Sequence, residues 1–245
     1  MKRSQSILLV FFAAAAAVLR FVQMKNGFDE NGLAVSGYPA ALALPAVLVL
    51  AALCFVFFSR SYPAQRDVTG GLADCFLLQD SFRITLGTAG SFLILVSAAL
   101  SFLRGNGSLL GNLFAAFAVA SGLCLLYALF VLYRGGSVQA VALLVPVCYL
   151  VLRLIFLYRT DAVDPVLQRV YIELLAFSAL TLSHLERAAF AFRGGAPRAY
   201  LPVSAMAVIL SLAAMAELPG LPDLLLYLGL VLIELTFLSA ADFTA

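Results

Sequence analysis

The residues best able to do chemistry lie inside one apolar stretch of the sequence, residues 167–191. Glu173 and His184 stand eleven residues apart, and eleven steps along an α-helix return to within about 20° of the same face. Ionisable side chains are costly in hydrocarbon, so a row of them predicts a functional site. The row as a whole comprises Arg169, Glu173, Thr181, His184 and Arg187.

Two further charged residues lie within other apolar stretches. Arg153 and Glu173 lie at similar distances from the turn at 159–166, so we expect them to pair at equal depth in a helical hairpin. Glu234 is expected at a comparable depth in the last stretch. One arginine and two glutamates can share a proton or hold a cation. The predicted intramembrane polar site consists of Arg153, Glu173, Thr181, His184 and Glu234.

This predicted site has two interpretations. In the functional one, it is a path for a proton or a solute, with Arg153 and Glu173 as the central pair. In the structural one, a buried ion pair fixes the register of the helices, and charges near the helix ends extend to the membrane surface. The sequence leaves both open.

The sequence offers no motif for catalysis or for a cofactor. It contains no serine nucleophile elbow, no metalloprotease spacing and no phosphate-binding glycine loop. One histidine and four dispersed cysteines do not provide the ligands of a zinc site. We therefore expect no catalytic residues, no metal and no cofactor. An intramembrane enzyme would need at least two carboxylates that converge on a cavity.

The composition is that of a membrane protein. Hydrophobic residues make up 64% of the chain and charged residues 11%, against roughly 45–50% and 25% in soluble domains. The apolar runs are long and continuous rather than alternating, which predicts transmembrane helices. The expected fold is therefore an all-α, polytopic bundle of about eight transmembrane helices. The net charge of +2 includes no basic run suited to nucleic acid.

The apolar stretches predict a single transmembrane domain, 1–245. The first stretch follows a basic start and also resembles a signal peptide, but we expect it to be retained as an anchor. Residues 60–82 predict either a short helix on the membrane surface or an early start of the third span. The expected helices are 6–24, 39–59, 83–103, 109–133, 138–158, 167–191, 200–218 and 223–243.

The distribution of lysine and arginine predicts the orientation of the chain. If the N-terminus lies in the cytoplasm, nine basic residues fall on the inner side and six on the outer side. Cytoplasmic loops carry the excess of basic residues in multi-pass proteins. We therefore expect a protein of the cell membrane with both termini in the cytoplasm.

One turn carries a family resemblance. An opening helix followed by Gly27-Phe28-Asp29-Glu30-Asn31-Gly32-Leu33 resembles small uncharacterised multi-pass membrane proteins of Gram-positive bacteria. The resemblance covers roughly the first forty residues, and it implies no activity, cofactor or substrate.

Two functions are consistent with these features. The first is a non-catalytic sensor, scaffold or accessory subunit, whose partners are the lipid bilayer and a membrane protein or a second copy. Small residues four apart, such as Gly87 and Ser91, predict close helix contacts of that kind. The alternative is a small proton-coupled or solute transporter that uses Arg153, Glu173 and Glu234.

Overall fold

Eight long α-helices account for most of the chain. The computed structural model describes residues 3–29, 35, 37–64, 66–67, 71–76, 78–104, 109–161, 167–192, 194–217 and 220–243. The helices are α1 (Arg3–Asn26), α2 (Pro39–Ser59), α3 (Ser81–Arg104), α4 (Leu109–Tyr133), α5 (Ala140–Asp161), α6 (Leu167–Ala191), α7 (Pro197–Met215) and α8 (Leu221–Ala240). The smaller elements are β1 (Arg66–Asp67), the 3₁₀ turn η1 (Gly71–Asp74) and β2 (Gly194–Gly195).

This architecture is the all-α polytopic bundle that the composition predicts. The helix ends differ from the expected ones by three residues or fewer. Within the described residues, seven helices are long and apolar enough to cross a membrane. The remaining helix, α6, is equally long but carries the row of polar residues. The most polar helix of the protein therefore lies among seven apolar ones.

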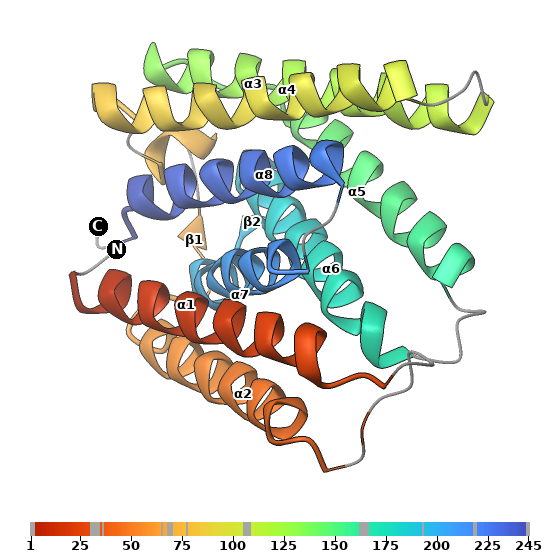
Figure 1. Ribbon diagram of the computed structural model, residues 1–245. Helices are drawn as coiled ribbons and strands as arrows, with labels where there is room; N and C mark the ends of the chain where they lie inside the picture. Colours follow the sequence, from red (N-terminus) through yellow and green to blue (C-terminus); the bar gives the residue numbers. More distant parts are fainter. Residues whose placement is uncertain are drawn as a thin grey trace.

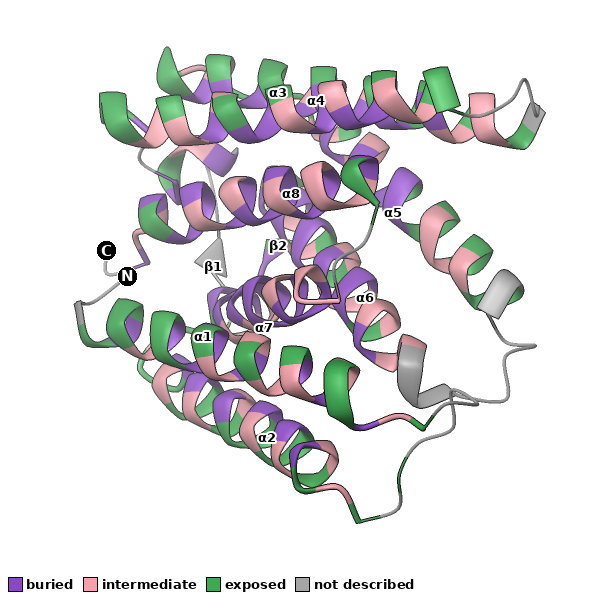
Figure 2. Ribbon diagram, in the orientation of Figure 1, coloured by how far each residue is buried: buried purple, intermediate pink, exposed green. Residues whose placement is uncertain are grey.

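The helix α7 lies at the centre of the bundle and packs against α1, α2, α6 and α8 (Figure 1). On the far side of α8 lie α3 and α4, and α5 packs between α4 and α6. The start of α1 and the end of α8 lie at the same end of the bundle (Figure 1). Figure 2 shows buried residues concentrated on α7 and α8, whereas the outer faces of α1 and α2 are exposed. These exposed faces carry apolar residues such as Val10 and Leu53, which suits a lipid environment.

Glycines allow α3 and α8 to pack very closely. A Cβ atom on Gly90 would lie 2.7 Å from the carbonyl oxygen of Gly229, and the reverse distance is also 2.7 Å. Gly87, one of the small residues expected to mediate helix contacts, packs against Leu129 and Thr236. Close backbone approach is the usual basis of helix association in lipid. These contacts fix the position of α8, the helix that carries Glu234.

The segment between α2 and α3 folds inward. Its strand β1 pairs with β2 in antiparallel fashion, Phe76 forms a β-bridge with Ala241, and the Asp242 amide donates to the Cys75 carbonyl at 2.9 Å. The sequence predicts that the apolar side chains of this segment belong either to a surface helix or to the start of the third span, and both alternatives are wrong, because they are buried inside the protein and precede α3. The buried ones are Leu72, Cys75, Phe76 and Leu78, and Leu77 lies outside the described residues.

Candidate functional site

A fully buried carboxylate on α8, that of Glu234, lies at the centre of a polar cluster. Its Oε1 atom lies 2.7 Å from Arg187 Nη2 and 3.2 Å from His184 Nδ1. Its Oε2 atom accepts hydrogen bonds from the hydroxyls of Ser183 at 2.7 Å and Ser204 at 2.5 Å. Because arginine is permanently charged and every neighbour donates, the carboxylate is ionised. We refer to these five residues as the inner cluster.

Helical periodicity explains how three helices supply this cluster. Ser183, His184 and Arg187 lie within one turn of α6, and residues three apart share a face. Ser204 comes from α7, which packs against both α6 and α8. All five residues are 2% exposed or less, and Ser183, Ser204 and Glu234 are completely buried. The cluster therefore lies inside the bundle and does not face lipid.

The hydrogen bonds of His184 determine which ring nitrogen carries the proton. Its Nδ1 atom lies 3.0 Å from the Leu180 carbonyl and 3.2 Å from Glu234 Oε1. Both neighbours are acceptors, so Nδ1 carries the hydrogen. In the neutral imidazole, Nε2 is then a bare acceptor. This Nε2 atom is buried and has no hydrogen-bond partner among the described residues.

Three more polar atoms of this region lack a partner within the described part of the chain. They are Nε and Nη1 of Arg187 and the hydroxyl of Tyr200. The Tyr200 hydroxyl lies beside Arg187 and Ser204 without reaching ordinary hydrogen-bond geometry. One face of the Arg187 guanidinium is covered by the Phe237 ring, whose centroid lies 4.1 Å from Cζ. Unpartnered buried polar atoms are uncommon in native proteins and call for an explanation.

An aromatic cluster closes the end of the bundle next to the inner cluster. The Phe76 ring makes edge-to-face contacts with Phe190, Tyr200 and Phe237 at centroid distances of 5.4–5.5 Å. Phe243 stacks on Phe190 at 5.7 Å. Tyr200 and Phe237 belong both to this cluster and to the surroundings of Arg187. We refer to these five rings as the aromatic seal, because they lie between the inner cluster and the end of the bundle where the inward-folded segment enters.

A second polar group, the outer cluster, lies nearer the opposite end of α6 and α8. Arg153 of α5 forms an ion pair with Asp223 of α8. The Tyr227 hydroxyl donates to Glu173 Oε1 at 3.0 Å, which joins α8 to α6. The Arg153 and Asp223 side chains are 25% and 37% exposed. The outer cluster is therefore much more accessible than the inner one.

A further buried arginine connects α1 to the end of α7. Arg20 is fully buried, and its Nη2 atom lies 2.7 Å from Glu217 Oε1. It also donates to Gln23 Oε1 at 2.9 Å and lies over the ring of Tyr171 at 5.2 Å. These contacts satisfy the side chain and attach α1 to the bundle. Arg20 therefore has a structural explanation that does not require a function.

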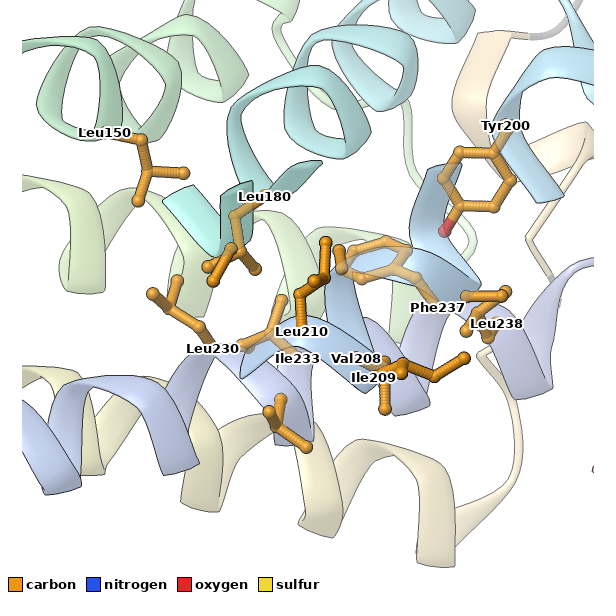
Figure 3. Close-up of a cluster of buried hydrophobic side chains, with 14 of the residues drawn as sticks. Leu150, Leu180, Tyr200, Val208, Ile209, Leu210, Leu230, Ile233, Phe237 and Leu238 are labelled. Atoms are coloured by element: carbon orange, nitrogen blue, oxygen red, sulfur yellow. The ribbon is translucent and has the colours of Figure 1, made fainter. Parts of the chain in front are cut away.

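An apolar layer separates the inner from the outer cluster. Tyr227 and Glu234 share a face of α8 and stand seven residues apart, which is roughly 10 Å along the helix axis. Leu180, Leu210, Leu230 and Ile233 gather in this region (Figure 3). Phe177 packs against Tyr227 with a centroid distance of 5.2 Å. One buried polar atom near this level lacks a described partner, the hydroxyl of Ser211, seven residues after Ser204 on α7.

The predicted five-residue site is divided between these clusters. His184 and Glu234 lie in the inner cluster, and Arg153 and Glu173 lie in the outer one. The sequence predicts Glu173 as the main partner of Arg153, but the ion pair that Arg153 forms is with Asp223. Thr181 donates to the Phe177 carbonyl of its own helix at 2.7 Å and contributes to neither cluster.

The reason for the difference is the depth of Glu234. It lies thirteen residues into α8, or roughly 20 Å, whereas Glu173 lies six residues into α6, or roughly 9 Å. Glu234 is therefore much closer to the inner end than Glu173 is. The residues that complete the clusters were not predicted from the sequence, although the seven-residue spacing of Tyr227 and Glu234 places both on one face of α8. The missed residues are Ser183, Tyr200, Ser204, Asp223 and Tyr227.

Metal ligands and thiols do not converge here. Among the residues that the structure describes, no group of three or more histidine, cysteine, aspartate or glutamate side chains could hold a metal ion. The four cysteines form no disulfide with one another, and Cys75 is the buried one among them. The Gly27–Leu33 turn lies partly outside the described residues.

Comparisons with models of protein families, with curated proteins and with solved structures give no match.

Proposed function

We propose that the protein is a small proton-coupled carrier of the cell membrane, with both termini in the cytoplasm and with the inner cluster as its binding site. The observation that carries this proposal is the set of unpartnered polar atoms around an ion pair that is completely buried in a membrane bundle. The excess of basic residues at the end where α1 begins supports the orientation.

A purely structural ion pair would be arranged differently. A buried charge is tolerated when its hydrogen-bonding groups are satisfied, and each group left unsatisfied costs about 1–3 kcal/mol. Glu234 is fully satisfied, whereas two nitrogens of Arg187 and one of His184 have no partner among the residues that the structure describes. The nitrogens without a partner support the binding of a ligand that enters and leaves the site. An ion pair that only fixed the register of the helices would give no reason to keep these nitrogens unsatisfied.

The two clusters supply the two ends of a route through the bundle. The inner cluster lies next to the aromatic seal, and the outer cluster is partly exposed at the other end. The apolar layer separates the two clusters. The buried hydroxyl of Ser211 lies at about the depth of this layer. In an alternating-access carrier, a midplane site opens to one side at a time. The aromatic seal and the apolar layer are the two barriers that such a cycle would open in turn.

Reconstitution tests this proposal. The full-length protein is placed in liposomes that contain a pH-sensitive dye, and a pH gradient is imposed with a mixture of sugars, amino acids and small anions outside. We expect a protein-dependent change of internal pH that is lost in Glu234→Gln. The matched control is Glu186→Gln on the same helix, which lies outside the inner cluster and should retain the flux. A wild-type protein without flux, or equal flux in both variants, would refute the carrier function.

A second candidate function rests on a separate surface. An apolar groove of about 300 Å³ lies between α1, α7 and α8 and is lined by residues that include Ala13, Ala17, Leu212 and Leu235. Small residues on one wall would admit a helix of another membrane protein, as expected for an accessory subunit. Ala14→Leu, which fills this groove, should then abolish co-purification of a partner. If no partner co-purifies with the wild-type protein either, this candidate is discarded.

A further inference from the structure

We infer that the inner cluster binds one small monovalent anion on Arg187 together with one proton on His184. This inference rests on the proposed carrier function and specifies its substrate class. It follows from the charge of the cluster and from the polar atoms that lack partners.

The inner cluster carries no net charge when His184 is in its neutral form, with the hydrogen on Nδ1. Arg187 then contributes one positive charge and ionised Glu234 one negative charge. An added proton would leave an uncompensated positive charge in a low-dielectric interior, and an added anion would leave a negative one. Either alone is costly where water is excluded. The two together keep the cluster neutral, so their binding should be linked.

The unpartnered atoms provide a place for each guest. Nε2 of His184 is a bare acceptor that can take up the proton. Within the described part of the chain, Nε and Nη1 of Arg187 have no acceptor in hydrogen-bond geometry, and charge-assisted hydrogen bonds from arginine to an anion are strong. The hydroxyl of Tyr200 can donate as well. Because Arg187 and His184 are 1% and 2% exposed, the anion must be small.

Other charged groups near α6 do not replace the anion. From α8 and α7 the cluster receives Glu234, already shared by four donors, and the neutral Tyr200. On α5, Arg153 is engaged with Asp223 in the outer cluster. The turn η1, which also packs against α6, contributes Asp74, whose side chain is exposed. Among the described residues, no second buried carboxylate neutralises a protonated His184.

Titration of the anion against pH tests the linkage. Chloride, nitrate and formate are each titrated into the full-length protein in lipid nanodiscs by calorimetry between pH 5 and 8, in buffers of different ionisation enthalpy. We expect the apparent affinity for at least one anion to rise as the pH falls, by up to about tenfold per pH unit. Binding should take up about one proton, because linkage is reciprocal.

Two variants assign the sites. His184→Gln should remove the pH dependence and the proton uptake, and Arg187→Gln should weaken anion binding at least roughly tenfold. Glu186→Gln is the matched control and should behave as wild type. If Arg187→Gln does not fold, the loss of pH dependence in His184→Gln still decides the question.

Two results would overturn the inference: no binding of any of the three anions, or binding that is independent of pH. The carrier function can be judged separately. If the liposomes show Glu234-dependent proton flux in the absence of these anions, the carrier proposal stands and the anion is not its substrate. If neither flux nor binding occurs, both proposals fail.

Discussion

The inner and outer clusters contain similar chemistry in different surroundings. Each centres on an arginine–carboxylate ion pair between α8 and a neighbouring helix, Arg187–Glu234 in one and Arg153–Asp223 in the other. The inner side chains are 1% and 0% exposed, whereas the outer ones are 25% and 37% exposed. The same pair of residue types is therefore solvated in one place and desolvated in the other.

This difference determines what each pair can do. A partly exposed ion pair is worth about 0–1 kcal/mol, because water and salt compete for both partners. In a buried pair, the loss of one partner leaves a charge that nothing solvates. The outer pair can open and close at little cost, as expected for an entrance. The inner pair can change only if another charge arrives or leaves at the same time.

The largest expected effect comes from removing one partner of each pair. Arg187→Ala should lower the free energy of unfolding by about 3–5 kcal/mol, because Glu234 is left as an uncompensated buried charge. Arg153→Ala, the matched outer variant, should lower it by about 0–1 kcal/mol. Both are measured by unfolding in mixed micelles, followed by circular dichroism. Equal losses in the two variants would show that the clusters do not differ in solvation.

A double replacement sharpens this result. If the loss in Arg187→Ala comes from the charge of Glu234, then Arg187→Met combined with Glu234→Leu should recover most of the stability, since a buried pair can be replaced by apolar residues of similar volume. The same double variant should have no proton flux. Recovery of stability without recovery of transport would separate the structural from the functional role of the pair.

The second prediction concerns the barrier at the inner end. Phe76→Ala removes the ring that contacts Phe190, Tyr200 and Phe237, and large-to-small changes at buried phenylalanine cost about 3–5 kcal/mol. Part of that cost is avoided if the inward-folded segment simply detaches. Phe82→Ala, at a ring that is 72% exposed, should change stability little and is the control.

A native thiol reports whether the segment detaches. Cys75 is completely buried next to Phe76, and its reaction with a water-soluble maleimide can be followed in a background with the other three cysteines replaced by alanine. Phe76→Ala should accelerate labelling of Cys75 by at least roughly tenfold, which corresponds to about 1.4 kcal/mol of local opening. Unchanged labelling would mean that the seal does not depend on this ring.

The fold could be predicted from the sequence largely because lipid imposes it. A stretch of about 20 apolar residues has one stable arrangement in a bilayer, and the observed helices from α1 to α8 follow those stretches closely. The site was only partly predictable. The face of α6 that carries Glu173 and His184 follows from its periodicity, but the partner of each residue depends on how far α8 is displaced along α6.

The inward-folded segment shows a second limit. Leu72, Cys75, Phe76 and Leu78 are too few and too irregularly spaced to specify a helix or a strand, and nothing in their pattern distinguishes a membrane surface from a protein interior. Their burial depends on the gap left by the ends of α6, α7 and α8. That gap exists only in the assembled bundle.

The third prediction concerns the hydrogen bond that joins α6 to α8 in the outer cluster. Tyr227→Phe removes the donor to Glu173 while it keeps the ring that packs on Phe177. The expected loss is about 1.5–3 kcal/mol at most, the usual range for a hydrogen bond to a charged group. Tyr127→Phe on the exposed face of α4 is the control, with no expected change. A loss as large as that of Arg187→Ala would contradict the distinction between the two clusters.

The smallest expected effect is that of Asp223→Asn, which keeps the shape of the outer partner and removes its charge. The stability loss should be about 0–1 kcal/mol at low salt, and it should shrink as salt increases from 0.01 to 1 M, since the screening length falls from about 30 Å to 3 Å. Glu234→Gln, the corresponding inner change, should lose more stability, and its loss should be nearly independent of the concentration of a sulfate salt, because bulk ions screen a completely buried pair little and a divalent anion is not the small monovalent guest inferred for the inner cluster. The measurement is unfolding in mixed micelles at four salt concentrations for each variant and the wild type. A salt-independent loss in Asp223→Asn would place the outer pair in the same environment as the inner one, and the outer cluster would then be a second closed barrier instead of an entrance.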